Sequence, residues 1–462
     1  MCAIERNQIT KDRFIFLLAI IGLLGYITYI CVVRPDVPYM NTIRYITDYA
    51  RLWSRNPIYL VRSWPDNQQS GLIDPLYVYL NIRYFSLNIL LACCLTGFVV
   101  TAFFITFALR ATANIRLPEY ILIPFIFALF LEAFSLNSWQ LYTLDLGLPE
   151  YVRNFLYLAI ILYADTLHRD NRIKYHAIFQ YGGLLIVSVI IFGMGEVYSF
   201  CGSLAATSSL VYLTSKRSPD SQIAVSNAPI IAIGPLIALV VYYSLSQVFA
   251  NSFHNLLISA KLVELVPIAL STSFLSAEAA RAIGFGQDAR FVLGILLIGA
   301  YIFGLVSACT RKAYALWFIP ATLATYGFLV SISIAIARGD GGASAVGASR
   351  YYDNFLFFGV GVIWLISLLL PENPFARRRL RLYLFATVIS ICVVTQAISL
   401  AVECRIAPYR AVAFLKMRNV ILHSSNPVTP QEARLLQVQS KRDAAYALSF
   451  AAKNGLGPFY GR

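Results

Sequence analysis

The amino-acid sequence predicts an all-α polytopic membrane protein. Of its 462 residues, 58% are hydrophobic and only 13% are charged, whereas soluble domains are roughly half apolar and a quarter charged. The apolar residues form long continuous runs, and a run of roughly 20 such residues crosses a bilayer as a helix. A strand of a membrane β-barrel would instead alternate apolar and polar residues. These two observations favour a helical bundle that crosses the membrane many times.

Hydropathy predicts about eleven membrane-spanning helices along the chain. The first apolar run is long enough to span and has no small-residue cleavage site, so we expect it to remain as an anchor. The sixth run is short and polar. The expected spans cover residues 14–33, 84–109, 118–134, 151–167, 177–195, 199–214, 228–250, 291–309, 313–337, 353–370 and 382–402.

The basic residues predict the orientation of these spans. Clusters of Lys and Arg stay on the cytoplasmic side of a membrane, and a cytoplasmic N-terminus places every compact cluster on that side. Eleven spans then put the C-terminus outside. The formal charge of +14 is therefore explained by topology, and we expect no nucleic-acid partner. The clusters are at residues 11–13, 110–116, 168–174, 215–217, 310–312 and 376–381.

The loop 34–83 is the longest polar interval in the first half of the chain, and we expect chemistry there. It contains six arginines, no lysine and four aspartates. Part of it, residues 41–53, predicts an amphipathic helix that either lies in the membrane interface or covers the bundle. Its apolar side carries Ile43, Ile46 and Ala50, and its polar side carries Arg44, Asp48 and Arg51.

Two further regions lie on the predicted outer face. The segment 251–290 is too short and interrupted to span twice, so we expect a re-entrant or interfacial segment. The sequence divides into a transmembrane domain, residues 1–402 with the 34–83 loop, and a helical tail, residues 403–462.

Capping signals predict two helices in the tail. Thr429 is a suitable N-cap, Pro430 fits the first helical position and Glu432 completes a capping box. A second helix is predicted to begin near Ser440 and to end near Asn454, which precedes a glycine.

Among charged side chains, Asp36 is the strongest candidate for a catalytic base. It follows the first span by three residues, where a partly desolvated carboxylate could take a proton from an acceptor hydroxyl. The alternative is a solvated aspartate paired with Arg34 or Arg44. Asp48, Asp66 and Asp74 are weaker candidates, because Asp66 and Asp74 sit beside prolines and suit turns.

Arginines are the candidates for binding a phosphate. The chain has 29 arginines and 8 lysines, and the guanidinium group binds phosphate through two parallel hydrogen bonds. We expect the donor phosphate to be bound by Arg83, Arg350 and Arg44. Arg338 offers a further anion contact. The alternative is that several of these side chains reach toward lipid headgroups.

A third set of residues suits a substrate pocket. Carboxylates at membrane depth are costly and tend to be paired or functional, and an indole ring with amides suits a sugar. The ring also fits an aromatic belt at the membrane interface. The set is Glu132, Asn137, Trp139, Gln140 and Glu196. The cysteines and histidines show no ligand spacing, so the sequence indicates no metal site and no other cofactor, and a divalent metal remains an unsupported alternative.

Several short motifs are spread over the predicted outer face and the tail. They are Asp36, Asn81-Ile82-Arg83, the cluster Asn137, Trp139 and Gln140, the stretch Ser199, Phe200 and Gly202, Ala348 to Tyr351, and Leu456 to Phe459. Together these motifs resemble bacterial polytopic glycosyltransferases of the GT-C type, such as O-antigen glucosyltransferases and polyprenyl-linked sugar transferases. Before the second span, where such relatives carry an Asn-Glu-His-Arg-like run, this chain has Ile73-Asp74-Pro75-Leu76.

The resemblance implies transfer of a sugar from a polyprenyl-phosphate donor to a cell-envelope glycan, lipid or protein. The reaction would take place on the outer face of the bacterial inner membrane, with Asp36 as base and Arg83 and Arg350 on the phosphate. We expect those three residues and Glu196 to line one outward-facing pocket. An O-antigen polymerase or ligase, or a transporter or flippase for lipid-linked glycans, remains an alternative.

Overall fold

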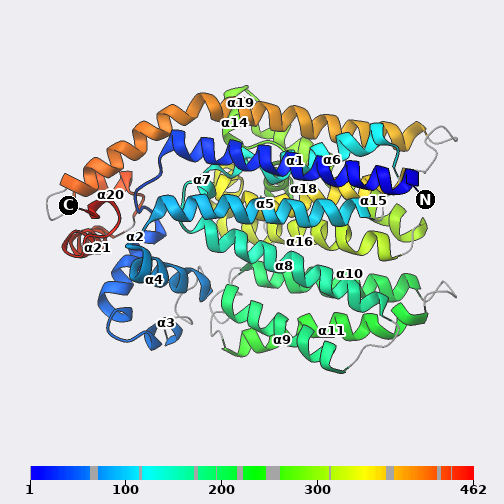
Figure 1. Cartoon of the computed structure of the whole chain (residues 1–462), viewed down its shortest axis with the longest axis horizontal. Helices are drawn as coiled ribbons and strands as arrows, with labels where there is room; N and C mark the ends of the chain where they lie inside the picture. Colours follow the sequence, from blue (N-terminus) through cyan, green and yellow to red (C-terminus); the bar gives the residue numbers. More distant parts are fainter. Residues whose placement is uncertain are drawn as a thin grey trace.

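The computed structural model describes most of the chain, and all of its regular structure in the described ranges is helical. The long helices run roughly parallel and form a bundle, and a smaller group of helices lies at one end of it (Figure 1). The described residues are 2–62, 71–113, 117–170, 175–193, 195–215, 222–245, 261–311, 314–370, 379–423, 428–438 and 440–461.

Six segments in these ranges are helical, long and apolar enough to cross a membrane, so the chain is a multi-pass membrane protein. Each overlaps a span predicted from hydropathy. Four of them lie within single helices: α1 (Cys2–Val33), α5 (Ile89–Ala113), α15 (Gln287–Arg311) and α19 (Arg379–His423). The other two join consecutive helices: Glu119–Tyr142 runs from α6 (Glu119–Ala133) through α7 (Trp139–Tyr142), and Tyr314–Val346 runs from α16 (Tyr314–Arg338) through α17 (Gly342–Val346).

The other five predicted spans also overlap helices, and residues 194 and 246–250 of those predictions lie outside the described residues. Among them, α18 is buried along its whole length, as expected for a helix that is apolar on all sides. Its 16 residues rise about 24 Å, less than the hydrocarbon thickness of about 30 Å. These helices are α8 (Gly147–Arg169), α9 (Tyr175–Phe192), α10 (Gly195–Ser215), α11 (Gln222–Leu245) and α18 (Tyr352–Ser367).

The predicted re-entrant segment forms two short helices, α13 (Lys261–Ser271) and α14 (Ala277–Ala282), joined by a buried turn. Residues 251–260 of that prediction lie outside the described residues. Helix α13 packs against α15 and α16. A Cβ atom on Gly294 would lie 1.9 Å from the carbonyl oxygen of Pro267, so a glycine is required for this close approach.

The smaller group, here called the end lobe, combines the first loop with the end of the chain. Its hydrophobic core is separate from that of the bundle. The lobe consists of α2 (Asn41–Asp48) with a π turn (Tyr49–Trp53), α3 (Ile58–Arg62), α4 (Ile73–Phe85), the end of α19, α20 (Pro430–Leu435) and α21 (Lys441–Lys453).

The local predictions for the lobe helices are confirmed. Ile43, Ile46 and Ala50 are buried, and this apolar side is covered by protein, because α2 packs against α21 and α4. The Thr429–Glu432 capping box is present with Pro430 in the first turn. The hydroxyl of Ser440 caps α21, which ends before Asn454.

Backbone contacts join the tail to the first loop. The predicted domain boundary at residue 402 falls inside α19, whose 45 residues continue into the lobe (Figure 1). The N–H of Met40 donates to the carbonyl of Leu436 at 3.0 Å, and the Thr47 hydroxyl donates to the carbonyl of Asp443 at 3.0 Å. The tail therefore packs as part of the lobe core.

Candidate functional site

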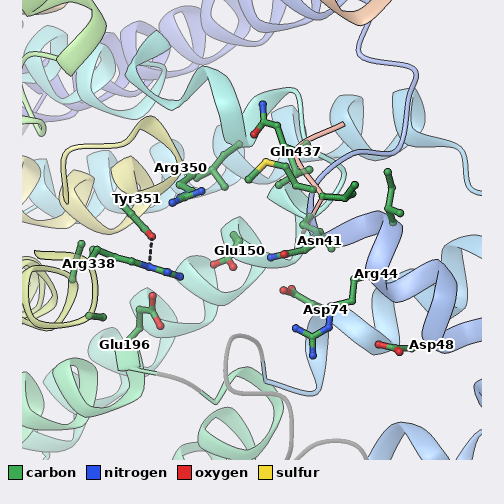
Figure 2. A pocket seen from close by; sticks show the side chains of 18 of the residues that line it. Asn41, Arg44, Asp48, Asp74, Glu150, Glu196, Arg338, Arg350, Tyr351 and Gln437 are labelled. Atoms are coloured by element: carbon green, nitrogen blue, oxygen red, sulfur yellow. Dashed lines mark hydrogen bonds between the residues drawn. The ribbon is translucent and has the colours of Figure 1, made fainter. Parts of the chain in front are cut away.

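A cavity of about 670 Å³ lies where the end lobe meets the bundle. Its size is in the range of small-molecule sites. Figure 2 shows charged side chains entering it from both walls. The described lining includes five carboxylates and four arginines, so the cavity is suited to a ligand with both anionic and hydroxyl groups. They are Asp48, Asp74, Glu150, Glu196 and Asp443, with Arg44, Arg51, Arg338 and Arg350.

The bundle wall is made by helix ends. Glu150 and Glu196 lie in the first turns of α8 and α10, and Arg338 lies in the last turn of α16. Acidic groups at helix starts and basic groups at helix ends are favoured by the helix dipole. Arg338 Nε donates to the hydroxyl of Tyr351 at 3.1 Å, and the Arg350 guanidinium lies 5.1 Å from the centre of the Tyr351 ring.

The lobe wall is the polar side of α2 together with α4 and the tail. Burial of Ile43 and Ile46 turns Arg44 and Asp48 toward the cavity. Asp74 enters from the first turn of α4 (Figure 2). A tail segment that includes Gln437 and Asp443 closes this side.

Ion pairs neutralise only part of this charge. Arg51 pairs with Asp443 at 2.9 Å. Behind the wall, buried Arg153 contacts Glu150 at 2.5 Å and Asp353 at 2.8 Å.

By contrast, three cavity arginines form no ion pair with any carboxylate in the described part of the chain. They are Arg44, Arg338 and Arg350. A guanidinium group without a carboxylate partner can bind a phosphate. The cavity therefore offers anion contacts from both walls.

Asp74 is the carboxylate best placed to act as a base. Its side chain is 5% exposed, and its Oδ1 atom has no hydrogen-bond partner among the described residues. Burial raises the pKa of Asp74 to about 7, Arg153 opposes this rise, and Asp145 and Glu196 add to it. A base with a pKa near the ambient pH transfers protons most effectively.

Asp145 supports this region from behind. It is buried and accepts a hydrogen bond from the Thr42 hydroxyl of α2. Burial raises the pKa of Asp145 to about 6, and the Thr42 hydrogen bond opposes the rise. This contact holds α2 against the loop that precedes α8.

The cavity brings together Arg44, Glu196 and Arg350, but its lining does not include Asp36 or Arg83. Asp36 Oδ2 lies 3.8 Å from Arg418 Nη1, at the side of α19. Arg83 is exposed at the end of α4. Asp66 lies outside the described residues.

Gln140 lies just behind the cavity wall. Its Oε1 atom accepts from the Ser349 hydroxyl at 3.3 Å, beside Arg350. Its Nε2 atom lies 3.3 Å from Met40 Sδ. Gln140 therefore links the two walls without lining the cavity.

Three other predicted pocket residues make packing contacts inside the protein. Glu132 is fully buried and accepts hydrogen bonds from Gln396 Nε2 at 3.1 Å and the Tyr352 hydroxyl at 3.0 Å. Asn137 Oδ1 accepts from the backbone N–H of Ser276 at 3.2 Å.

The Trp139 ring is covered by the guanidinium of Arg410, 3.2 Å from its centre. Its Nε1 atom donates to Glu278 Oε1 at 3.4 Å. Through these contacts α14 and α19 pack against the short helix α7 (Trp139–Tyr142), which contains Trp139.

Sequence reasoning ranked Asp74 low and did not select Glu150. For Asp74 the sequence did contain a signal, because Asp74, Val78 and Asn81 follow one another at helical spacing and so predict a shared helix face. In the structure all three residues are buried in α4. The adjacent Pro75 is acceptable in a first helical turn. Glu150 offered no such signal, because an acidic residue is common in the first turn of any helix. It reaches the cavity only through the packing of α8.

The described residues contain no group of three or more His, Cys, Asp or Glu side chains that could hold a metal ion. Comparison with family models, curated proteins and solved structures gives no match to this chain.

Proposed function

We propose that this protein is a membrane glycosyltransferase that moves a sugar from a polyprenyl-phosphate donor to a hydroxyl of a cell-envelope glycan, lipid or protein. One observation carries the proposal. A single cavity at the end of a membrane bundle contains three arginines that form no ion pair with a carboxylate of the described residues, together with a buried carboxylate, Asp74, whose pKa is raised to about 7. The motifs that resemble GT-C enzymes add support.

In the proposed reaction, the acceptor oxygen attacks C1 of the donor sugar. Its proton passes to Asp74, and the bond between C1 and the phosphate oxygen breaks. The polyprenyl phosphate leaves with the bonding electrons. Arg338 and Arg350 stabilise the charge that develops on the phosphate, which is usually the largest catalytic effect of a preorganised site. A single displacement inverts the configuration at C1.

Asp74 takes the role that was predicted for Asp36, because Asp74 lines the cavity and Asp36 does not. Arg44 faces the reacting groups from the lobe wall. We place the reaction on the outer face of the bacterial inner membrane, following the predicted orientation. No metal takes part in the proposed step.

Transfer of label tests this proposal. Purified protein in lipid vesicles is incubated with radiolabelled polyprenyl-phosphate sugars and with cell-envelope acceptors. We expect Asp74→Asn to reduce transfer by about 100-fold or more, the usual contribution of a general base. Arg350→Gln should reduce it by about 100-fold through lost charge stabilisation.

Asp36→Asn and Arg83→Gln are the matched controls, and both should retain most of the activity. Loss of transfer in Asp36→Asn with full activity in Asp74→Asn would reassign the base. Absence of transfer from every donor by folded protein would contradict the function itself. Transfer of a preassembled glycan would indicate a polymerase or ligase, and label that crosses the bilayer without a new bond would indicate a flippase.

A further inference from the structure

The C-terminal half of α4 exposes an apolar and aromatic surface. Leu80, Tyr84 and Phe85 are 40%, 70% and 55% exposed, and Arg83 between them is also exposed. Leu80 and Tyr84 are four residues apart and therefore lie on one side of the helix. The helix packs against α2 and α8, and its first turn carries Asp74 into the cavity.

This surface continues into the apolar outside of α5. That helix begins at Ile89, and its exposed side chains near the start are Leu90, Leu91, Leu95 and Phe98. In a multi-pass membrane protein such a surface faces lipid. The 25 residues of α5 measure about 37 Å, more than the hydrocarbon thickness of about 30 Å. The first turn of α5 therefore lies near the lipid headgroups.

The junction between α4 and α5 is held in one geometry. Ser86 and Leu87 have φ angles of 52° and 60°, which only a well-supported turn maintains in residues other than glycine. The N–H of Leu87 donates to the carbonyl of Asn81, and the N–H of Asn88 donates to Asn81 Oδ1, both at 3.0 Å. From the tail, the N–H of Gly457 donates to the Ser86 carbonyl at 2.8 Å.

We propose that residues 80–85 of α4 lie in the membrane interface and anchor the end lobe to the bilayer. Tyr84 and Phe85 enter the boundary between headgroups and acyl chains, where aromatic rings are favoured. Arg83 reaches the lipid phosphates. Asp74 lies in the first turn of the same helix, about 15 Å along the axis from Tyr84, so the anchor holds the cavity near the membrane surface. This inference does not depend on the proposed function.

Photo-crosslinking tests the anchor directly. The photoreactive residue p-benzoylphenylalanine replaces Tyr84 in the full-length protein, reconstituted in vesicles of phosphatidylcholine and phosphatidylglycerol. After irradiation, lipid adducts are counted by mass spectrometry. The control carries the same residue at Tyr446, which is 41% exposed on α21, at the far end of the lobe (Figure 1).

We expect lipid adducts to be several times more abundant at position 84 than at position 446. Arg83→Gln should lower the share of phosphatidylglycerol among the adducts at position 84. Equal adduct yields at the two positions would overturn the proposal. If the variant at position 84 does not fold, the same replacement at Phe85 gives the same comparison.

Discussion

The bundle and the end lobe are built on different principles. The bundle core is formed by long apolar helices that each satisfy their backbone hydrogen bonds internally, and many of them pack on helices nearby in sequence. The lobe core joins short helices from residues 34–88 to the last part of the chain, about 350 residues away in sequence, and the ends of α1, α5 and α19 add side chains to it. Its buried side chains include many tyrosines, among them Tyr39, Tyr45 and Tyr49.

This difference has a consequence for the cavity. The cavity lies at the boundary of the two cores, and its charged groups come from both sides. The bundle supplies Glu196, Arg338 and Arg350, whereas the lobe supplies Arg44 and Asp74. A substitution in the bundle should therefore affect the whole protein, and a substitution in the lobe should affect the cavity and its surroundings first.

The largest expected effect is in the bundle, from Arg153→Gln. This change leaves Glu150 and Asp353 without the buried cation that contacts both. Removing one partner of a buried ion pair costs about 3–5 kcal/mol, so the thermal unfolding temperature in detergent should fall steeply. Arg405→Gln, at an exposed arginine of α19, should leave it unchanged. Equal unfolding temperatures for the two variants would show that the network contributes little.

In the lobe, Leu436→Ala should cause a local loss of stability. Leu436 is fully buried between the tail and the first loop, and such a truncation costs about 2–5 kcal/mol. Hydrogen exchange should increase in α2, α20 and α21 while the bundle helices stay protected. The control is Leu415→Ala, at a leucine that is 58% exposed. Uniform loss of protection in both regions would show that lobe and bundle unfold together.

The pH dependence of lobe stability should follow Asp74. Its folded pKa of about 7 lies above the ordinary value of 3.8, so the folded state binds more protons than the unfolded state between these values. Stability therefore decreases as the pH rises from about 4 to about 7, and stays low above that. Asp74→Asn should remove this decrease and be more stable than the natural protein at pH 8.

Thermal unfolding of both proteins between pH 4 and pH 8 measures the difference. Asp340→Asn serves as the control at an exposed carboxylate. A difference between Asp74→Asn and the natural protein that is the same at pH 4 and pH 8 would contradict the raised pKa.

The smallest expected effect concerns the ion pair between Arg51 and Asp443 at the rim of the cavity. Their side chains are 43% and 39% exposed, and exposed pairs contribute about 0–1 kcal/mol. A double-mutant cycle of Arg51→Ala and Asp443→Ala should therefore give a coupling energy of at most about 1 kcal/mol. A larger coupling would mean that this pair is a main support of the cavity wall.

The features that could be predicted from the amino-acid sequence are those that depend on neighbouring residues. Hydropathy located the long apolar helices, and amphipathic spacing identified α2 and its buried side. Capping residues set the start of α20 and both ends of α21. Each of these features depends on interactions within a few helical turns, so a single segment contains all the information that is needed.

Which charged residues share a cavity is set by the packing of distant segments and could not be predicted from the sequence. Arg44, Asp74 and Glu196 are separated by long stretches of sequence, and their meeting depends on the packing of the tail against the first loop. The same packing left Asp36 and Arg83 outside the lining and gave Glu132, Asn137 and Trp139 contacts within the protein. Burial, ion pairing and pKa are properties of this three-dimensional environment, and no local pattern in the chain encodes them.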